Sequence, residues 1–219
     1  MTREKARYGA EFLGTTFLLM IIVGSGIMAN RLAQGNTALA LLANSLATGS
    51  GLFVLIHALG PISGAHFNPA VSLLETLSGR LDQKNLLLYW LAQFTGALFG
   101  VFMTHLMFDM NLLQLATTER SGVGLTVSEF VATFGLLATV ELTSRKRVEL
   151  TPAAVATYIT SAYWFTPSTS FANPAVTIAR IFTDTFCGIA PAGVPWFLIA
   201  QIIGTLTARA LLPKRCETL

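Results

Sequence analysis

Six long apolar stretches dominate the sequence and restrict the fold more than any other feature. Most are about 20 residues long, and a helix of that length crosses the roughly 30 Å hydrocarbon core of a bilayer. Only 11% of the residues are charged, against about 25% in an ordinary soluble domain, which is too few to cover a soluble surface. The sequence therefore predicts an all-α membrane protein with six transmembrane helices. Their expected positions are Tyr8–Ala29, Ala38–Leu59, Leu86–Met107, Gly124–Leu142, Thr151–Phe165 and Trp196–Leu212.

Most basic residues lie in short clusters between these stretches. The net charge of +3 does not indicate a nucleic-acid partner, because such clusters are the pattern that sets membrane topology. Eleven of the 14 Lys and Arg residues fall on one side of a six-span path. By the positive-inside rule we expect both termini in the cytoplasm and the chain in the cell (inner) membrane. The eleven are Arg3, Lys5, Arg7, Arg80, Lys84, Arg145, Lys146, Arg147, Arg209, Lys214 and Arg215, and the other three are Arg31, Arg120 and Arg180.

The two halves of the sequence repeat one another. Ala10-Glu11-Phe12 in the first stretch recurs as Ser128-Glu129-Phe130 in the fourth, and Ala92-Gln93 in the third recurs as Ala200-Gln201 in the sixth. Three spans per half is an odd number, so the second half is inverted in the membrane relative to the first. We expect one transmembrane domain over residues 1–219, with repeats at about 1–110 and 123–219. Small residues four apart predict close helix packing in both halves; they are Gly96 with Gly100, and Gly204 with Ala208.

Asn-Pro-Ala occurs twice, 105 residues apart, as Asn68-Pro69-Ala70 and Asn173-Pro174-Ala175. In each copy Asn is a good N-cap and Pro fits the first helical position, so each copy begins a helix too short to span a bilayer. We expect two re-entrant half-helices whose N-termini meet, one from the cytoplasmic side and one from outside. One copy alone is ordinary turn chemistry, but two copies at corresponding points of an inverted repeat are not.

Two opposed helix starts place two positive dipole ends at the same depth, an arrangement that is stable in hydrocarbon only around a water-filled path. The side-chain oxygens of Asn68 and Asn173 cap their helices and leave the amide N–H groups for the lumen. A neutral solute can accept those hydrogen bonds, whereas a cation meets a positive barrier. The motifs therefore predict a pore with a central constriction.

With these residues the sequence resembles the major intrinsic protein family, the aquaporins and aquaglyceroporins. The resemblance rests on Ser63-Gly64-Ala65-His66-Phe67-Asn68-Pro69-Ala70-Val71, on Asn173-Pro174-Ala175 and on the repeat marks Glu11 and Glu129, and it covers essentially the whole chain. It implies six spans plus two half-helices, one pore per subunit, a homotetramer in the lipid bilayer, and passive conduction of water or small uncharged solutes.

The sequence departs from the family pattern at Val176. The residue after the second Asn-Pro-Ala is usually Arg in the family and narrows the outer constriction. The other constriction positions, carried over by their spacing from the two Asn residues, are Thr48, Ser161 and Ser170. Such a ring is uncharged and small, so we expect a path that passes glycerol, urea or neutral metalloid hydroxides such as arsenous acid. The stretch Ala162–Phe171 also resembles a bacterial branch linked to arsenic resistance.

Further polar residues have less specific meanings. The family resemblance makes Glu11 and Glu129 buried acceptors that support the re-entrant loops, although an ionisable residue within a span is by default functional. His66 is expected in the cytoplasmic vestibule. Glu75 and Arg180 each follow their half-helix Asn by seven residues, which makes them symmetry-related, and their role stays open.

The alternative function is an ion-coupled secondary transporter, because inverted repeats and broken helices are also typical of that class. Few ionisable residues at mid-membrane argue against it. A membrane enzyme has no support, since three scattered His residues assemble neither a catalytic triad nor a metal site. Cys187 and Cys216 are expected as unpaired thiols, and no cofactor is expected.

Overall fold

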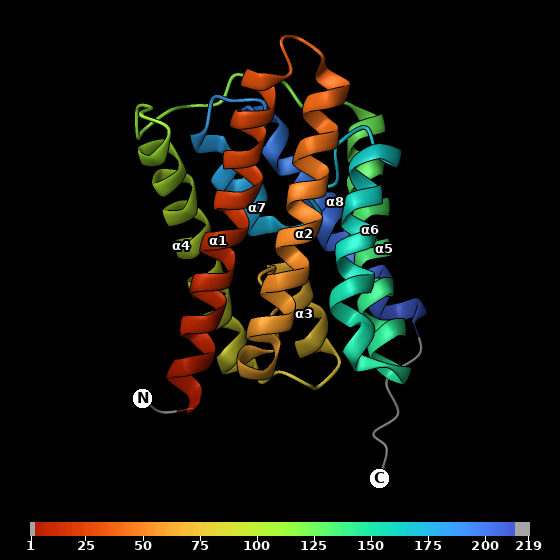
Figure 1. The fold of residues 1–219 in the computed structure, drawn as a ribbon. Coiled ribbons are helices and arrows are strands. Elements are labelled where there is room, and N and C mark those ends of the chain that lie inside the picture. Colours follow the sequence, from red (N-terminus) through yellow and green to blue (C-terminus); the bar gives the residue numbers. More distant parts are fainter. Residues whose placement is uncertain (1–2, 213–219) are drawn as a thin grey trace.

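The computed structural model describes residues 3–212, except the side chains of Arg3 and Lys146. Those two side chains, with Lys214, Arg215 and Cys216 of the sequence predictions, therefore lie outside the described part. The described residues form a helical bundle without strands (Figure 1). The helices are α1 (Arg3–Leu32), α2 (Thr37–Ser63), α3 (Pro69–Leu77), α4 (Gln83–Met107), α5 (Val123–Lys146), α6 (Thr151–Phe165), α7 (Pro174–Ala179) and α8 (Val194–Leu211), with short 3-10 turns η1 (Val148–Leu150), η2 (Arg180–Phe182) and η3 (Pro191–Gly193).

Helix lengths agree with the predicted spans. Five helices, α1, α2, α4, α5 and α8, are long and apolar enough to cross a membrane. The fifth predicted span is α6, whose 15 residues reach only about 22 Å at 1.5 Å per residue. It packs along α2 and α5, so it lies within the bundle as a span would. α3 and α7 are the two short helices that the Asn-Pro-Ala motifs predict.

Local sequence explains where several helices begin and end. Pro69, Pro152, Pro174 and Pro195 each stand in the first turn of a helix, where a missing N–H costs nothing. α2 ends at Gly64, whose φ of 89° is left-handed and suits glycine because it has no Cβ. The chain can therefore turn sharply there and run back into the bundle.

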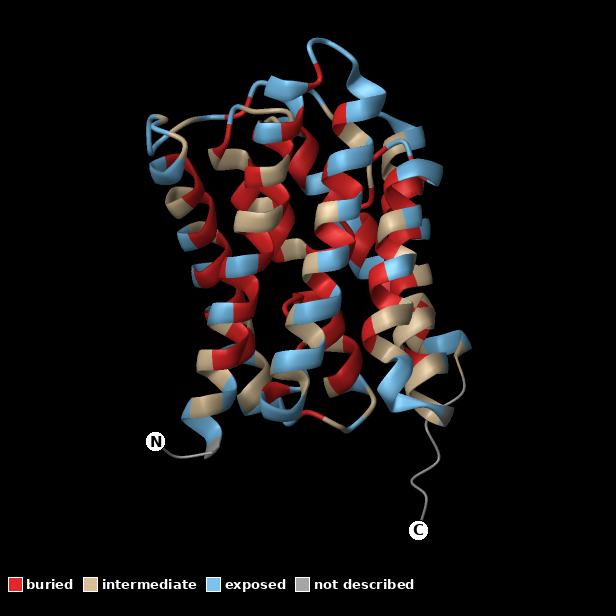
Figure 2. Cartoon of the chain, viewed as in Figure 1, coloured by how far each residue is buried: buried red, intermediate tan, exposed pale blue. Residues whose placement is uncertain are grey.

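The bundle turns apolar residues outward and polar residues inward. Each long helix exposes large apolar side chains, among them Leu13, Leu46, Leu88, Val127 and Ile202, which are 42–53% exposed. Figure 2 places the buried positions mainly on the helix faces turned into the bundle. The fully buried residues include charged and amide side chains, which a soluble core rarely holds; they include Glu11, Gln93, Glu129 and Gln201. The apolar outer surface of the bundle is suited to contact with lipid.

The two halves follow the same order of elements, with a short helix third in each. α3 lies toward the end of the bundle where α1 begins and α8 ends, and α7 lies toward the opposite end (Figure 1). This is the arrangement that an inverted repeat predicts. α1 packs on α2 and α4, as α5 packs on α6 and α8.

Glycines allow the close approach of α1 and α4. A Cβ on Gly96 would lie 2.5 Å from the carbonyl oxygen of Phe12, which a real Cβ never does. The hydroxyl of Thr16 also donates to the Gly96 carbonyl oxygen at 3.1 Å. In the other half, a Cβ on Gly204 would lie 3.0 Å from the carbonyl oxygen of Phe130. The predicted small-residue contacts are thus present in both halves.

Candidate functional site

Asn68 and Asn173 begin the two short helices from inside the bundle. The Oδ1 of Asn68 accepts from the backbone N–H of Ala70 at 2.9 Å, and the Oδ1 of Asn173 accepts from those of Ala175 and Val176 at 3.0 and 3.3 Å. Each Asn therefore caps its own helix.

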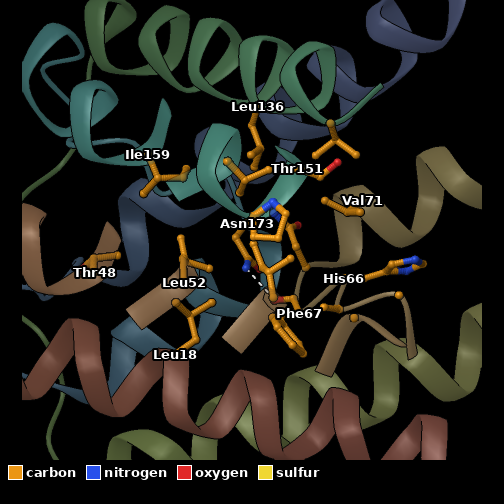
Figure 3. A pocket seen from close by; sticks show the side chains of 18 of the residues that line it. Leu18, Thr48, Leu52, His66, Phe67, Val71, Leu136, Thr151, Ile159 and Asn173 are labelled. Atoms are coloured by element: carbon orange, nitrogen blue, oxygen red, sulfur yellow. Dashed lines mark hydrogen bonds between the residues drawn. The ribbon is translucent and has the colours of Figure 1, made fainter. Parts of the chain in front are cut away.

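The two asparagine amides also join the loops to each other. The Nδ2 of Asn68 donates to the carbonyl oxygen of Ala172 at 2.7 Å. The Nδ2 of Asn173 donates to that of Phe67 at 2.9 Å, and Figure 3 shows these two residues. Each amide therefore uses one of its two N–H groups on the opposite loop. This refines the expectation that the whole amide faces the lumen, because only the second N–H of each is left for it.

The residues that precede the asparagines have an unusual backbone. Phe67 and Ala172 have φ angles of 49° and 47°, a left-handed conformation that costs about 1–2 kcal/mol for a residue with a Cβ. Because the carbonyl oxygens of these two residues accept the amide bonds, the strained conformation serves the contact between the loops.

Glu11 holds the first loop, the segment that precedes Asn68, in that conformation. Its carboxylate accepts from the backbone N–H groups of His66 and Phe67 at 2.9 and 2.7 Å and from the Ser63 hydroxyl at 2.7 Å. It also accepts from the Nε2 of Gln93 at 2.8 Å. The carboxylate is fully buried, and these four donors take the place of water around its charge.

Glu129 fastens the second loop in the same way. It accepts from the backbone N–H groups of Phe171 and Ala172 at 2.8 and 2.9 Å, and from the Nε2 of Gln201 at 2.7 Å. Gln201 donates as well to the hydroxyl of Thr177 at 2.9 Å. Neither Glu11 nor Glu129 lines the cavity described next.

The glutamines Gln93 and Gln201 were predicted only as marks of the repeat. Gln93 connects the Glu11 carboxylate to the hydroxyl of Ser72 on α3 at 2.9 Å, and Gln201 connects Glu129 to α7 in the corresponding way. Their recurrence at matching positions in the third and sixth spans was the available signal, since an amide inside a span needs a polar partner.

A cavity of about 540 Å³ runs beside both asparagines. Its walls are mostly apolar, with Leu18, Leu52, Leu136 and Ile159 around Asn173 (Figure 3). Asn68 and Asn173 both line it, so the short-helix starts and the cavity belong to one site. No group of three or more His, Cys, Asp or Glu side chains that could hold a metal occurs among residues 3–212.

Comparison with known proteins explains this arrangement. Residues 2–170 match the family Major intrinsic protein. The chain belongs to the major intrinsic protein family. The resemblance predicted from the paired motifs is thereby confirmed, and with it the fold class. This is a family of multi-pass membrane channels for water and small solutes.

Individual proteins agree with the family assignment. The chain is 52% identical over 203 residues to the aquaglyceroporin AqpS of Rhizobium meliloti (strain 1021), covering 93% of this chain and 87% of that protein. It is 31% identical over 207 residues to aquaporin NIP2-2 of Zea mays, covering 90% of this chain and 67% of that protein. The X-ray structure of the aquaglyceroporin from Plasmodium falciparum has the same fold, with a TM-score of 0.71, 18% identity and 94% of each chain covered.

Three of the four predicted constriction positions line the cavity, namely Thr48, Ser170 and Val176. Ser161 does not. Its side chain is exposed on the other face of α6 and donates to the Tyr158 carbonyl oxygen at 2.8 Å. Tyr163, two residues further along α6, lines the cavity instead. Two residues turn a helix by about 200°, so a shift of two carries a side chain to the opposite face.

Tyr163 changes the character of the ring in this member of the family. Its hydroxyl lies 3.2 Å from that of Thr48, so the two side chains bridge α6 and α2 at the wall of the path. With Tyr163 counted in place of Ser161, the four positions are Thr48, Tyr163, Ser170 and Val176. These side chains are uncharged, and together they are bulkier than the expected set with two serines.

His66 lines the same cavity. Its Nδ1 lies 3.0 Å from the Ser72 hydroxyl, and its ring stands 5.1 Å from that of Tyr89. In Figure 3 the His66 side chain lies apart from that of Asn173.

Proposed function

We propose that this protein is a passive membrane channel, not an enzyme, for water and small uncharged solutes such as glycerol, urea and arsenous acid. The observation that carries the proposal is the cavity beside Asn68 and Asn173, with Val176 where the family usually has Arg. The similarity to AqpS, a protein named as an aquaglyceroporin, supports it.

The asparagine pair suits neutral solutes. Each amide keeps one N–H after its bond to the opposite loop, and these donors can bind the oxygen of water, a polyol or urea. A cation offers no acceptor to them. The central constriction, formed by Asn68-Pro69-Ala70 and Asn173-Pro174-Ala175, is therefore expected to orient a neutral solute by its oxygen.

The wall of the path suits solutes with both hydroxyl and carbon groups. Apolar side chains such as Leu18, Leu52 and Ile159 line one part, and the hydroxyls of Thr48 and Tyr163 another. Water gains nothing from apolar contact, whereas the carbons of glycerol do. With Val at position 176, no guanidinium stands at that position of the path.

Stopped-flow light scattering on proteoliposomes tests the proposal. Water, glycerol, urea and arsenite should all cross faster than in protein-free vesicles of the same lipid. Water flux without flux of any of the three larger solutes would contradict the proposed solute range. No flux of any kind would contradict the channel itself.

The rival function, an ion-coupled transporter, makes a different prediction in the same vesicles. Solute uptake would then depend on a sodium or proton gradient and saturate at low solute concentration. Such coupling needs a carboxylate that meets the solute. Glu11 and Glu129 bond to backbone and glutamine donors and do not line the cavity. Of the two carboxylates that do line it, Glu75 is ion-paired with Arg80, and Glu149 lies in the exposed turn η1. We expect flux proportional to the solute gradient and unchanged by an ionophore.

The proposed setting is a homotetramer in the cell (inner) membrane, with one path per subunit and both termini cytoplasmic. The single domain over residues 1–219 with inverted repeats at about 1–110 and 123–219 belongs to the same proposal. Crosslinking in membranes tests the tetramer, and protease access to tags at either end tests the orientation.

A further inference from the structure

Glu75 and Arg180 occupy corresponding positions in the two halves but have different partners. Each stands seven residues after its asparagine and lines the cavity. Glu75 forms an ion pair with Arg80 at 2.7 Å, and Arg80 forms a second with Glu141 at 2.6 Å. Arg180 makes no ion pair with any residue that the structure describes. The second half therefore places an uncompensated positive charge beside the path.

Arg180 follows Val176 by one helical turn. Its backbone N–H donates to the Val176 carbonyl oxygen, and residues four apart lie on the same face of a helix. The side chain is only 3% exposed. The positive charge that an Arg at position 176 would carry is therefore present in the same path, on Arg180, one helical turn further from the asparagine pair.

Two contacts hold the Arg180 side chain. Its Nε donates to the Cys187 carbonyl oxygen, and its Cζ lies 3.4 Å from the centre of the Phe171 ring. Its two terminal nitrogens form no hydrogen bond with a described residue, yet they are not completely buried. A buried charge without a counter-ion is costly unless water or a ligand solvates it, which fits a guanidinium that faces a hydrated cavity.

Arg120 is a second arginine close to the Phe171 ring. Its Cζ lies 5.2 Å from the ring centre, and it donates to the carbonyl oxygens of Gly188, Ser168 and Phe186 at 2.9, 3.3 and 3.3 Å. Burial, and then the nearby Arg180, lower the pKa of Arg120 to about 10, so it stays charged at neutral pH. Arg120 does not line the cavity, and each of its three side-chain nitrogens donates to a backbone carbonyl oxygen.

We propose that Arg180 is a selectivity residue of this channel, and that its charge excludes cations and protons while position 176 stays open to larger neutral solutes. The inference rests on the proposed function. In the family pattern one Arg both narrows and charges the outer constriction; here Arg180 supplies the charge, and Val176 leaves the constriction wide.

The test compares leak and solute flux in proteoliposomes of the full chain. Proton leak is read with an entrapped pH dye, potassium leak with an entrapped potassium dye, and glycerol flux by stopped flow. Two unit charges about 6 Å apart at an effective dielectric near 20 repel enough to change cation passage roughly 100-fold, and water and salt reduce this to about tenfold. We therefore expect Arg180→Gln to raise both leaks about tenfold or more, with glycerol flux retained.

Two further variants separate charge from shape. Arg180→Lys keeps the charge and should leak like the parent, whereas Arg31→Gln removes an exposed positive charge that does not line the cavity and should change nothing. An Arg180→Gln channel that conducts glycerol and stays as tight as the parent would overturn the inference. So would an Arg180→Lys channel that leaks as much as Arg180→Gln.

Val176→Arg gives a test that leaves Arg180 untouched, and so does not depend on whether Arg180 variants fold. Because Arg180 already supplies the barrier, the added charge should lower glycerol flux and leave the leaks where they were. A tenfold fall in leak would show that the parent lacked an effective barrier and would overturn the inference. A parent that passes no solute would instead count against the proposed function, so the two failures are distinguishable.

Discussion

The hydroxyls of Tyr163 and Thr48 lie 3.2 Å apart and connect α6 to α2 beside the path. Replacing Tyr163 by Ser removes both the contact with Thr48 and the aromatic side chain of Tyr163. Glycerol flux should then rise about three- to tenfold, which corresponds to roughly 0.7–1.4 kcal/mol off the barrier. Stopped-flow swelling measures it. Ser161→Ala, on the exposed face of α6, is the matched control and should conduct glycerol as the parent does. If Ser161→Ala changed glycerol flux more than Tyr163→Ser, Ser161 and not Tyr163 would line the path.

Val176→Arg should restrict the path to water. A guanidinium fills space that glycerol, urea and arsenous acid need, so we expect their flux to fall about tenfold or more, equivalent to a barrier higher by about 1.4 kcal/mol. Water flux should change much less. Val176→Leu controls for bulk without charge. If Val176→Arg leaves the flux of these solutes unchanged, the narrowest point of the path lies elsewhere.

Glu11→Gln should destabilise the fold. Each carboxylate oxygen of Glu11 accepts from two donors, so whichever way the amide turns, its NH2 faces donors and leaves them unpaired. The expected cost is about 2–4 kcal/mol. The thermal midpoint in detergent measures it, with Glu4→Gln, at an exposed position, as the control. Equal midpoints for the two variants would mean that Glu11 does not hold the loop.

Gly96→Ala should separate α1 from α4. The new Cβ would meet the Phe12 carbonyl oxygen at 2.5 Å, and overpacking of this kind costs about 1–3 kcal/mol. Gly9→Ala is the matched control, because nothing lies within 4 Å of its Cβ position, and it should be neutral or slightly stabilising. Thermal midpoints compare them. A Gly96→Ala protein as stable as the Gly9→Ala protein would contradict the close contact.

Much of the fold could be predicted because the bilayer leaves few choices. Apolar length fixed the spans, and the predicted range Thr151–Phe165 coincides with α6. Pairing of Asn68 with Asn173 followed from the repeat, since only an inverted second half brings two helix starts together. These predictions depend on spacing within helices, which is regular.

The features that could not be predicted depend on loops and on contacts between halves. Ser161 was placed by counting back from Asn173 through an irregular loop, and a difference of two residues moved the position to Tyr163. The bonds of the asparagine amides to Ala172 and Phe67 depend on left-handed backbone that no residue type in these loops signals. Glu75 pairs with Arg80, and Arg180 contacts Cys187 and Phe171. These partners are near in sequence, but the contacts depend on the path of the loops and not on helical spacing.

The exchange of hydrogen bonds between Asn68 and Asn173 has a consequence for biogenesis. Each asparagine is oriented by a carbonyl oxygen from the other half, and the loop of Asn173 is fastened through Gln201 on α8, which follows α7 in the chain. A nascent chain that has inserted its first half thus has no finished conduit. A complete path therefore requires both halves of the chain to be in place.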